Sequence, residues 1–580
     1  MKAWWKDRVV YQIYPRSFQD SSEGGISGSD GIGDIPGIIS RLDYIKDIGA
    51  GIIWLSPVYK SPDADNGYDI SDYYSIDPKF GSLRDMEKLF AEAKKRDIKI
   101  IMDLVINHTS DEHEWFQKSR DPASPYRDYY IWRPPRYETL RSGCGKKRLP
   151  PNNWTGFFMG EVWEYDEKSG EYYLHLFDKK QPDLNYKNPR VIEEIKNILR
   201  FWLDKGASGF RCDVINIIYK TSLEDGKKSM AVPSALQVVC GIEHYKSQEG
   251  NHAVLRELRR DVLDHYDCFT VGETVMVDLD EAKLLCDEGR KELNMLFYFD
   301  HLEIDRRIAR FIPKKFRASR LLEVLTRWQC GLQWNALYLE NHDQARIVSH
   351  FGEGTCSSDG KPSRYWQRSA KTLALLELTL RGTPFVFQGQ EIGMTNFDFK
   401  SLEEVNDVES HGLNKLMKKM HIPGFLRWRW IKTSSRDNAR TPMQWDSGEN
   451  AGFSKAKPWL GVNRNYRYIN YDSQKNDPAS VFNFYKTLIA LRQKTECLKY
   501  GEFLPIYADN RIMIYQRKLL NEVYAIALNF SSHTVKLPKK AAGLFTGTSL
   551  VSNTGRAALE GQLLPWEGVV YFSLISSSGV

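Results

Sequence analysis

Short β-rich runs alternate with longer segments of helical periodicity through most of the chain, and this alternation limits the folds open to it. Most of the runs are apolar at consecutive positions, which is typical of strands buried on both faces of a parallel sheet. Within the segment 83–96, Leu83, Met86, Leu89, Phe90 and Ala93 recur at helical spacing. The expected strands are 9–14, 51–55, 98–106, 207–213, 268–273, 295–300, 336–340 and 384–388.

Eight strands, most of them followed by a helix, predict an α/β protein built as a parallel (β/α)₈ TIM barrel. A doubly wound open sheet is the alternative, but no GxGxxG motif follows the first strand.

Two segments depart from a plain barrel. Residues 107–180 are rich in Trp, Tyr, Pro, Asn and Gly and are too long for an ordinary βα loop, which predicts an inserted subdomain after the third strand. After about residue 505 short strands separated by turn residues predict a C-terminal antiparallel β-sandwich. The expected division is 1–106 and 181–504 for the barrel, 107–180 for the insertion and 505–580 for the β domain.

Charge and composition argue against several kinds of partner. The 81 basic and 75 acidic residues leave a net charge of +6 without a concentrated basic block, so nucleic-acid binding is not expected. No run of about 18 apolar residues occurs and the start carries no apolar signal region, so neither membrane insertion nor secretion is expected. The eight cysteines are scattered singly, which favours reduced thiols in the cytoplasm.

Four expected strands end in or near a carboxylate, where a barrel of this kind places its chemistry. These residues are Asp103, Asp213, Glu273 and Asp343. Burying several carboxylates around one opening is costly unless they are paired or used, so the set predicts a functional site.

Two carboxyl groups in different environments are what cleavage of a glycosidic bond requires. The abundant Trp and Tyr suit sugar rings, which present apolar faces. A serine nucleophile is disfavoured because no GxSxG occurs, and a catalytic zinc is disfavoured because no HExxH occurs.

Ten sequence blocks, in order, make the chain similar to a known family. The chain resembles the α-glucosidases of the α-amylase superfamily over nearly its whole length, most of all the oligo-1,6-glucosidase (isomaltase) group. The blocks are VVYQIYPRSF (9–18), NGYDISDYYSIDPKFG (66–81), DLVINHTS (103–110), NNWTGFFMGEVWEYD (152–166), YYLHLFDKKQPDLNY (172–186), GFRCDVIN (209–216), VGET (271–274), ENHDQAR (340–346), GQEIGMTN (389–396) and SRDNARTPMQWD (435–446).

The resemblance implies the catalytic roles. Asp213 is expected to be the nucleophile, Glu273 the general acid/base and Asp343 a third carboxylate that stabilises the oxocarbenium-like transition state. Arg211 lies two residues before Asp213 on the same strand face and can keep it ionised. Asp103 is expected to act as a partner of Arg211 rather than as a catalytic group.

The same resemblance implies a closed sugar pocket. Tyr68 is expected to stack on the terminal glucose, Asp69 to accept hydrogen bonds from its hydroxyls, and His108 and His342 to donate to it. Arg440 is expected to join Asp69, with a salt bridge in a loop as the alternative. Val214, directly after the nucleophile, is expected to border the leaving-group side, since resembling enzymes with Val there favour α-1,6 bonds.

The implied activity is that of a retaining, exo-acting α-glucosidase. It would release terminal α-1,6-linked glucose, and some other α-linked glucose, from small α-glucosides such as isomaltose, with sucrose and maltose as further candidates. Two alternatives within the superfamily are a sucrose isomerase or transglucosylase and a trehalose-6-phosphate hydrolase. A non-catalytic heavy chain of an amino-acid transporter is disfavoured, because no spanning helix occurs and the carboxylates are present.

No cofactor is expected for catalysis, but a structural Ca²⁺ is a candidate. Relatives usually carry a DxNxDGxGD loop with oxygen ligands at alternate positions, the ligands that this hard cation prefers. Here Asp20, Asp30 and Asp34 are the candidate ligands, and a Gly/Ser-rich stretch at 21–29 lengthens the loop and displaces the middle Asn.

Overall fold

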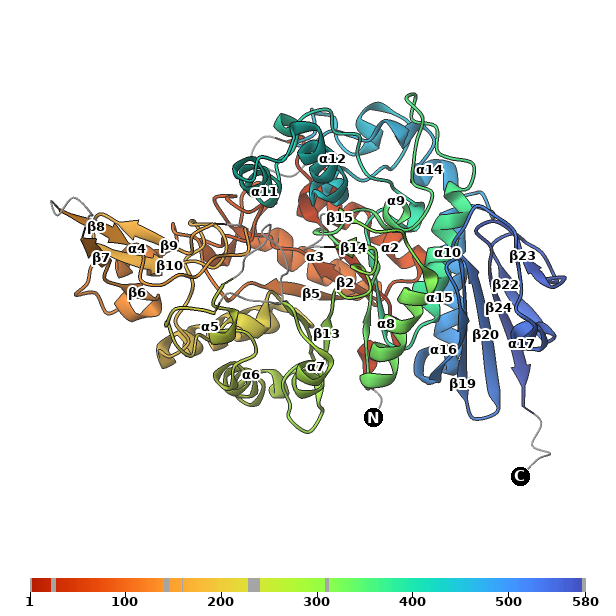
Figure 1. Cartoon of the computed structure of the whole chain (residues 1–580), viewed down its shortest axis with the longest axis horizontal. Helices are drawn as coiled ribbons and strands as arrows, with labels where there is room; N and C mark the ends of the chain where they lie inside the picture. The colour runs from red at the N-terminus through yellow and green to blue at the C-terminus, as the bar shows by residue number, and fades with distance from the viewer. Residues whose placement is uncertain are drawn as a thin grey trace.

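The computed structural model describes residues 3–21, 28–139, 145–158, 160–227, 240–307 and 312–575, without the side chains of 306, 307, 312 and 313. In these ranges no helix combines the length and the apolar character that crossing a membrane requires. In Figure 1 the chain is elongated, with an orange segment at one end, a blue sheet at the other and the barrel between them.

Eight parallel strands form a nearly closed barrel, which confirms the predicted fold class. The order in the sheet is β13-β12-β11-β5-β2-β1-β17-β16, so the first barrel strand pairs with both the second and the last. A doubly wound open sheet is therefore excluded. The strands are β1 (Val10–Ile13), β2 (Ile52–Leu55), β5 (Lys99–Leu104), β11 (Gly209–Cys212), β12 (Phe269–Glu273), β13 (Met295–Phe297), β16 (Ala336–Leu337) and β17 (Thr383–Phe387).

Several strands end earlier than the apolar runs predict. The run 98–106 yields a strand that stops at Leu104, and the run 336–340 yields only Ala336–Leu337. The residues beyond these ends, such as Asn107 and Glu340, are buried and polar and make side-chain hydrogen bonds instead of ladder pairs. The chain therefore leaves the sheet where the site begins.

Helices cover the outside of the barrel. In α3 the apolar Met86, Leu89, Phe90 and Ala93 are all buried, as their spacing predicts, and Ser82 forms a capping box with Asp85. The main barrel helices are α2 (Leu42–Ile48), α3 (Leu83–Lys95), α5 (Pro189–Lys205), α6 (Glu249–Asp261), α7 (Leu279–Cys286), α8 (Ala318–Gly331), α10 (Trp366–Thr379) and α15 (Val481–Lys494).

The segment between β5 and α5 builds small structures of its own. Strand β10 (Glu171–Leu174) pairs antiparallel with β6 (Trp132–Arg133) and with β9 (Trp163–Asp166), while β7 (Arg136–Thr139) pairs with β8 (Lys146–Leu149). These strands and α4 (Glu114–Ser119) lie at the orange end of the molecule in Figure 1.

The C-terminal sheet is antiparallel, in the order β18-β19-β20-β24-β22, and packs against α8 and α10. Its strands are β18 (Glu502–Ala508), β19 (Ile512–Leu519), β20 (Glu522–Asn529), β22 (Thr548–Ser552) and β24 (Gly568–Leu574), with β21 (Val535–Lys536) and β23 (Gln562–Leu563) as a separate pair. Because β18 begins at Glu502, this sheet starts before the expected boundary at 505. The division into domains stays a prediction.

Arg517 of β19 ties this sheet to the barrel helices. Its guanidinium is fully buried and donates to the carbonyl oxygens of Thr379, Leu498 (2.8 Å) and Gly501 (2.6 Å). These carbonyls belong to the end of α10 and to α16 (Glu496–Tyr500) and the residue after it.

We expect Arg517→Met to lower the free energy of unfolding by about 3 kcal/mol, because three buried carbonyl groups each lose one donor. The control is Lys518→Met on the same strand, where the side chain is exposed. Thermal unfolding followed by circular dichroism should show a lower midpoint for Arg517→Met alone. Equal midpoints for the two variants would contradict this role of Arg517.

Candidate active site

The carboxyl ends of neighbouring barrel strands bring acidic side chains together. Arg211 of β11 and Asp103 of β5 are direct partners in the parallel register, and β12, the next strand, ends at Glu273. Asp213 follows β11 directly, and its N–H donates to the carbonyl of Leu104 at 3.0 Å. The sheet register alone therefore places these groups at one edge.

Arg211 is the centre of this group. Its Nη1 donates to Asp103 Oδ1 and to Asp213 Oδ1, both at 2.7 Å, and its Nη2 donates to Glu273 Oε2 at 2.6 Å. Only 1% of the residue is exposed, so these charge-assisted hydrogen bonds lie in a medium of low dielectric. One guanidinium thus orients both carboxyl groups that the sequence predicts as nucleophile and acid/base.

Three carboxylates around one guanidinium carry more negative charge than it neutralises. Burial raises the pKa of Asp213 well above its ordinary value despite the charge of Arg211, and Glu273 and Asp103 raise it further. Burial also raises the pKa of Asp103 to about 6. Such neighbouring groups titrate together, so the shifts belong to the set, and the charge of Arg211 alone does not hold down the pKa of Asp213 as the sequence predicts.

Asp343 belongs to a second, more cationic group. Arg440 Nη2 donates to its Oδ1 at 2.6 Å, Arg436 Nη1 lies 3.5 Å from the same oxygen, and His342 Nε2 lies 3.3 Å from Oδ2. Burial raises the pKa of Asp343, but His342, Arg436 and Arg440 outweigh it, so the pKa lies well below its ordinary value. This carboxylate therefore stays ionised.

Tyr68 connects the two groups. Its hydroxyl donates to Asp103 Oδ2 at 3.2 Å and lies 2.6 Å from His342 Nε2, and the two rings stack at a centroid distance of 5.3 Å. The Gln12 amide nitrogen lies 2.8 Å from His342 Nδ1 and can only donate, so Nε2 carries the proton. Burial lowers the pKa of His342 to about 3, which keeps this ring neutral.

His108 supports the Tyr68 loop from the other side. Its Nε2 lies 3.1 Å from the carbonyl oxygen of Tyr68, and burial lowers its pKa to about 4. The neutral ring can therefore donate to that carbonyl, and Gln181 Nε2 lies 3.1 Å from the same ring nitrogen.

The predicted contact between Arg440 and Asp69 is wrong. Arg440 bonds to Asp343 and, through Nε, to the carbonyl of His342 at 2.9 Å. Asp69 turns into its own loop, where it accepts from Ser61 Oγ (2.9 Å) and from the N–H groups of residues 64 (2.8 Å) and 65 (3.1 Å). An aspartate that follows a tight loop satisfies those donors first.

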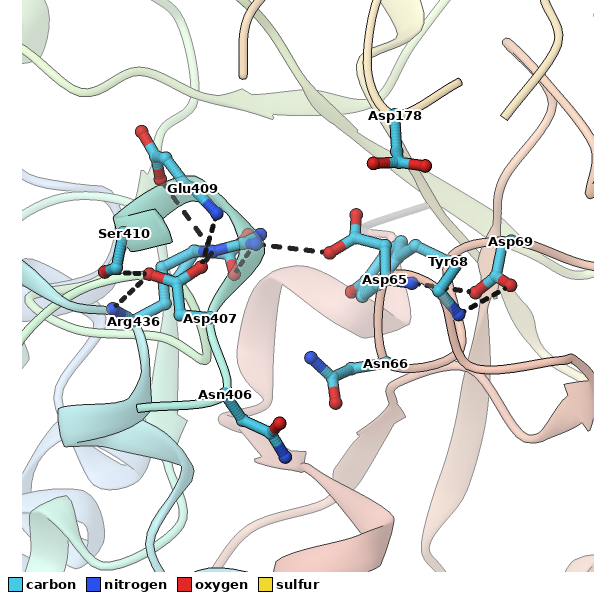
Figure 2. A network of polar contacts seen from close by, with 12 residues as sticks. Asp65, Asn66, Tyr68, Asp69, Asp178, Asn406, Asp407, Glu409, Ser410 and Arg436 are labelled. Carbon is cyan, nitrogen blue, oxygen red and sulfur yellow. Dashed lines mark hydrogen bonds and ion pairs between the residues drawn. The ribbon is translucent and has the colours of Figure 1, made fainter. Parts of the chain in front are cut away.

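In this loop it is Asp65, not Asp69, that pairs with an arginine, and that arginine is Arg436 rather than the predicted Arg440. Arg436 Nη2 donates to Asp65 Oδ1 at 3.2 Å, and Arg436 Nε donates to Asp407 Oδ1 at 2.7 Å (Figure 2). Figure 2 shows Asp65 and Asp69 on one loop, with Asp65 directed at the arginine.

Sequence reasoning missed Asp65 and Arg436, although both had a signal. Asp65 lies three residues before Tyr68 in the same loop. Arg436 is the N-terminal flanking residue of the short helix α13 (Asp437–Arg440) and stands four residues before Arg440, which puts both on one face.

Val214 adopts a conformation that is rare for a β-branched residue, with φ 38° and ψ 40°. Its N–H donates to Glu273 Oε2 at 3.4 Å. Its side chain is buried in a cluster with Trp154 and Leu176 of the inserted segment and with Tyr245. The strained turn after Asp213 therefore joins Glu273 to the inserted segment.

The candidate calcium ligands have hydrogen-bond donors from the chain itself. Asp20 Oδ2 accepts from Ser29 Oγ (2.7 Å) and from the N–H of residue 31 (2.9 Å), while Asp34 caps α1 (Ile35–Ser40) through the N–H of residue 37 (2.6 Å). Asp30 accepts from the N–H of residue 32 at 2.9 Å.

Within the described part of the chain, no three His, Cys, Asp or Glu side chains gather as a metal site would require. A structural Ca²⁺ at Asp20, Asp30 and Asp34 stays a prediction. Residues 22–27 of this loop lie outside the described ranges.

The comparisons with known proteins agree with this geometry. The family described as "Alpha amylase, catalytic domain" matches residues 12–501. An oligo-1,6-glucosidase from Parageobacillus thermoglucosidasius is 45% identical, over 98% of this chain and 99% of that protein.

Two solved structures extend the comparison. Trehalose-6-phosphate hydrolase from Bacillus licheniformis, as a variant in complex with a ligand, has a TM-score of 0.87 at 38% identity and covers 98% of this chain and 100% of that one. A variant of isomaltulose synthase from Erwinia rhapontici, in complex with sucrose, has a TM-score of 0.89 at 38% identity, with 99% of both chains covered.

A barrel with carboxylates gathered at one edge around a buried arginine is the frame of a glycoside hydrolase. The chain belongs to the α-amylase family.

We expect Asp103→Asn to move the acid limb of the pH profile of kcat/KM to lower pH by about half a unit or more. The Asp103 charge helps to raise the pKa of Asp213, so its removal lowers that pKa and lets Asp213 ionise in more acidic solution. The measurement is the initial rate on a chromogenic α-glucoside from pH 4 to pH 8.

Asp97→Asn serves as the control, because Asp97 lies just before the opposite end of the same strand and is exposed. An acid limb that stays in place or moves to higher pH in Asp103→Asn would show that Asp103 does not act on the nucleophile.

Proposed function

We propose that this chain is a retaining, exo-acting α-glucosidase that hydrolyses terminal α-1,6-linked glucose, and some other α-linked glucose, from short α-glucosides. The observation that supports it is the Arg211 guanidinium, which is hydrogen-bonded to Asp213 and Glu273 at once. The relative from Parageobacillus thermoglucosidasius bears the name of this activity.

The proposed reaction has two steps. In the first, an Asp213 oxygen attacks the anomeric carbon, Glu273 gives its proton to the leaving oxygen, and a β-glucosyl ester forms. In the second, Glu273 takes a proton from water, the water oxygen attacks the same carbon, and the bond to Asp213 breaks. Asp343, held ionised by His342, Arg436 and Arg440, stabilises the positive charge that develops on the sugar.

Sugar recognition is assigned to the groups that link the two clusters. Tyr68 is hydrogen-bonded to His342 through its hydroxyl and to His108 through its carbonyl oxygen. All three residues are buried, so they offer a preorganised wall for one glucose. We propose that Asp65 and Arg436 also bind sugar hydroxyls, and that Asp69 acts by holding the loop that carries Tyr68.

Two related activities remain as alternatives, because solved structures of both kinds resemble this chain closely. An isomaltulose synthase has a TM-score of 0.89, and a trehalose-6-phosphate hydrolase one of 0.87. The products formed from sucrose, glucose plus fructose or an isomeric disaccharide, separate hydrolysis from isomerisation. Activity on trehalose 6-phosphate but not on isomaltose would favour the other hydrolase.

We further propose that catalysis needs no cofactor, since the acid, the base and the nucleophile are all side chains of this chain. The proposed partners are isomaltose and isomalto-oligosaccharides, with sucrose and maltose as further candidates. A cytoplasmic location stays a prediction; all seven cysteines in the described ranges are free thiols, as that prediction expects.

We expect Asp213→Asn and Glu273→Gln each to lower kcat by at least a thousandfold, because each change removes one member of a pair that acts as a unit. The wild type should release glucose first as the α-anomer, which NMR detects before mutarotation. Asp178→Asn is the control, since Asp178 lies near Asp65 in Figure 2 but outside the proposed chemistry.

Initial release of β-glucose would mean inversion and would contradict a covalent role for Asp213. So would more than about a hundredth of the wild-type kcat in Asp213→Asn.

We expect isomaltose to be cleaved with a higher kcat/KM than maltose, and Val214→Thr to narrow or reverse the ratio. Threonine is also β-branched, so the unusual backbone conformation at position 214 costs about the same free energy in the variant. The change therefore tests the side chain alone. One methyl or hydroxyl group in a pocket is worth about 1–3 kcal/mol, so a preference rather than exclusivity is expected.

Val162→Thr is the matched control, because Val162 is fully buried in the same cluster but does not adjoin the nucleophile in sequence. Faster cleavage of maltose by the wild type would be evidence against this role, as would an unchanged ratio in Val214→Thr.

A further inference from the structure

A cavity of about 850 Å³ lies outside the catalytic group. Three segments line it: 354–360, which precedes α10, 395–406, which follows β17, and 459–464. None of the proposed catalytic residues is among its lining residues. Its volume falls in the range of pockets that hold small molecules.

Two half-exposed aromatic rings form part of the wall. The Phe397 ring packs against Phe399 at a centroid distance of 4.6 Å, and its Cζ lies so close to Gly461 that a Cβ added there would come within 2.8 Å of it. Trp459 is held by a hydrogen bond from its Nε1 to Ser17 Oγ (3.0 Å). Both rings are therefore fixed surfaces rather than mobile side chains.

Buried amides hold the walls together. Asn463 Nδ2 donates to the carbonyls of Thr395 (3.1 Å) and Asn396 (3.0 Å), and Asn465 Nδ2 donates to Thr395 Oγ1 at 2.7 Å. Asn463 and Asn465 are almost completely buried. The segments on either side of the cavity are thus joined before any ligand arrives, which lowers the entropy cost of binding.

The polar lining carries both signs of charge. Asp398, Glu403 and Glu404 stand with Lys400 and Arg464 around the opening, and Lys400 pairs with Asp398. Such a lining offers donors and acceptors without the concentrated positive charge that an anion requires. Fixed aromatic faces beside mixed donors and acceptors suit a neutral ligand with apolar faces and many hydroxyl groups.

We propose that this cavity is a second carbohydrate-binding site, which takes a neutral mono- or disaccharide with its ring against Phe397 and Trp459. This site is separate from the one that performs the proposed hydrolysis. The ring centroids of Trp459 and Tyr14 are 6.5 Å apart, and the Tyr14 ring stacks on His342. The two sites therefore share a wall of aromatic residues.

Cys356 provides a direct test, because it is an exposed residue that lines the cavity, where its Sγ lies 3.5 Å from Asn465 Nδ2. Cys330 is an internal control, since it is also an exposed residue but lies on α8. The probe is a sulfur-linked α-1,6-diglucoside, which resists hydrolysis. Alkylation of each thiol by iodoacetamide is followed by mass spectrometry of the peptides, with and without the probe.

We expect the saturating probe to slow alkylation of Cys356 at least fivefold and to leave Cys330 unchanged. Phe397→Ala and Arg464→Ala should each abolish the protection while kcat/KM on isomaltose stays within twofold of the wild type. Phe425→Ala should keep the protection. This change removes a ring that is 73% exposed on α12 (Gly424–Ser434), outside the cavity.

Three results would overturn the proposal: no protection at 100 mM probe, equal slowing of both thiols, or protection that persists in both cavity variants. A fourth result would also overturn it. This is protection that has the same half-saturating probe concentration as the inhibition of hydrolysis and that is lost when a competitive inhibitor fills the catalytic pocket. Failure of the proposed hydrolysis leaves the thiol assay unaffected, so the two proposals fail separately.

Discussion

The buried guanidinium of Arg211 is the interaction on which the site depends. It compensates Asp103, Asp213 and Glu273 in a place where water can do little, and an uncompensated buried carboxylate costs several kcal/mol. The compensation of negative charge is incomplete, because three carboxylates face one guanidinium. The surplus negative charge raises the pKa of Asp213, and two carboxyl groups in different environments are the requirement for acid/base work on a glycosidic bond.

The barrel supplies this arrangement through its register. Parallel strands that pair residue by residue place Arg211 opposite Asp103, and their common direction brings every carboxyl end to one edge. Asp343 arrives by another route, since β16 ends at Leu337 and an irregular segment carries the chain on to it. The ionised state of Asp343 is therefore set by Arg436 and Arg440, which belong to the start and the end of the short helix α13 and lie far along the sequence. The two carboxylate groups differ in charge state because the elements that surround them differ.

The strands, the helices and the meeting of Asp103, Asp213 and Glu273 at one edge of the barrel could be predicted from sequence, since apolar runs and the acids at their ends are local signals. The partner of Arg440 could not be predicted in this way. Asp69 and Asp65 are four residues apart in one loop, and only the fold of that loop decides that Asp69 turns inward while Asp65 meets Arg436. The loop after β1 shows the same limit, because the sequence does not reveal which donors reach its aspartates: Ser29 Oγ donates to Asp20 Oδ2 and Ser21 Oγ donates to Asp34 Oδ2. Long-range loop contacts carry no periodic signal.

Glu273 and the inserted segment are joined through Val214, the residue after Asp213. Val214 gives its N–H to Glu273 and its side chain to the hydrophobic cluster of the inserted segment. A change in the packing of that cluster, at Trp154 or Tyr245 for example, therefore reaches the acid/base through one strained backbone position without touching a polar group. Protein interiors are packed closely enough to transmit such shifts. The core of the inserted segment is thus continuous with the turn that follows Asp213.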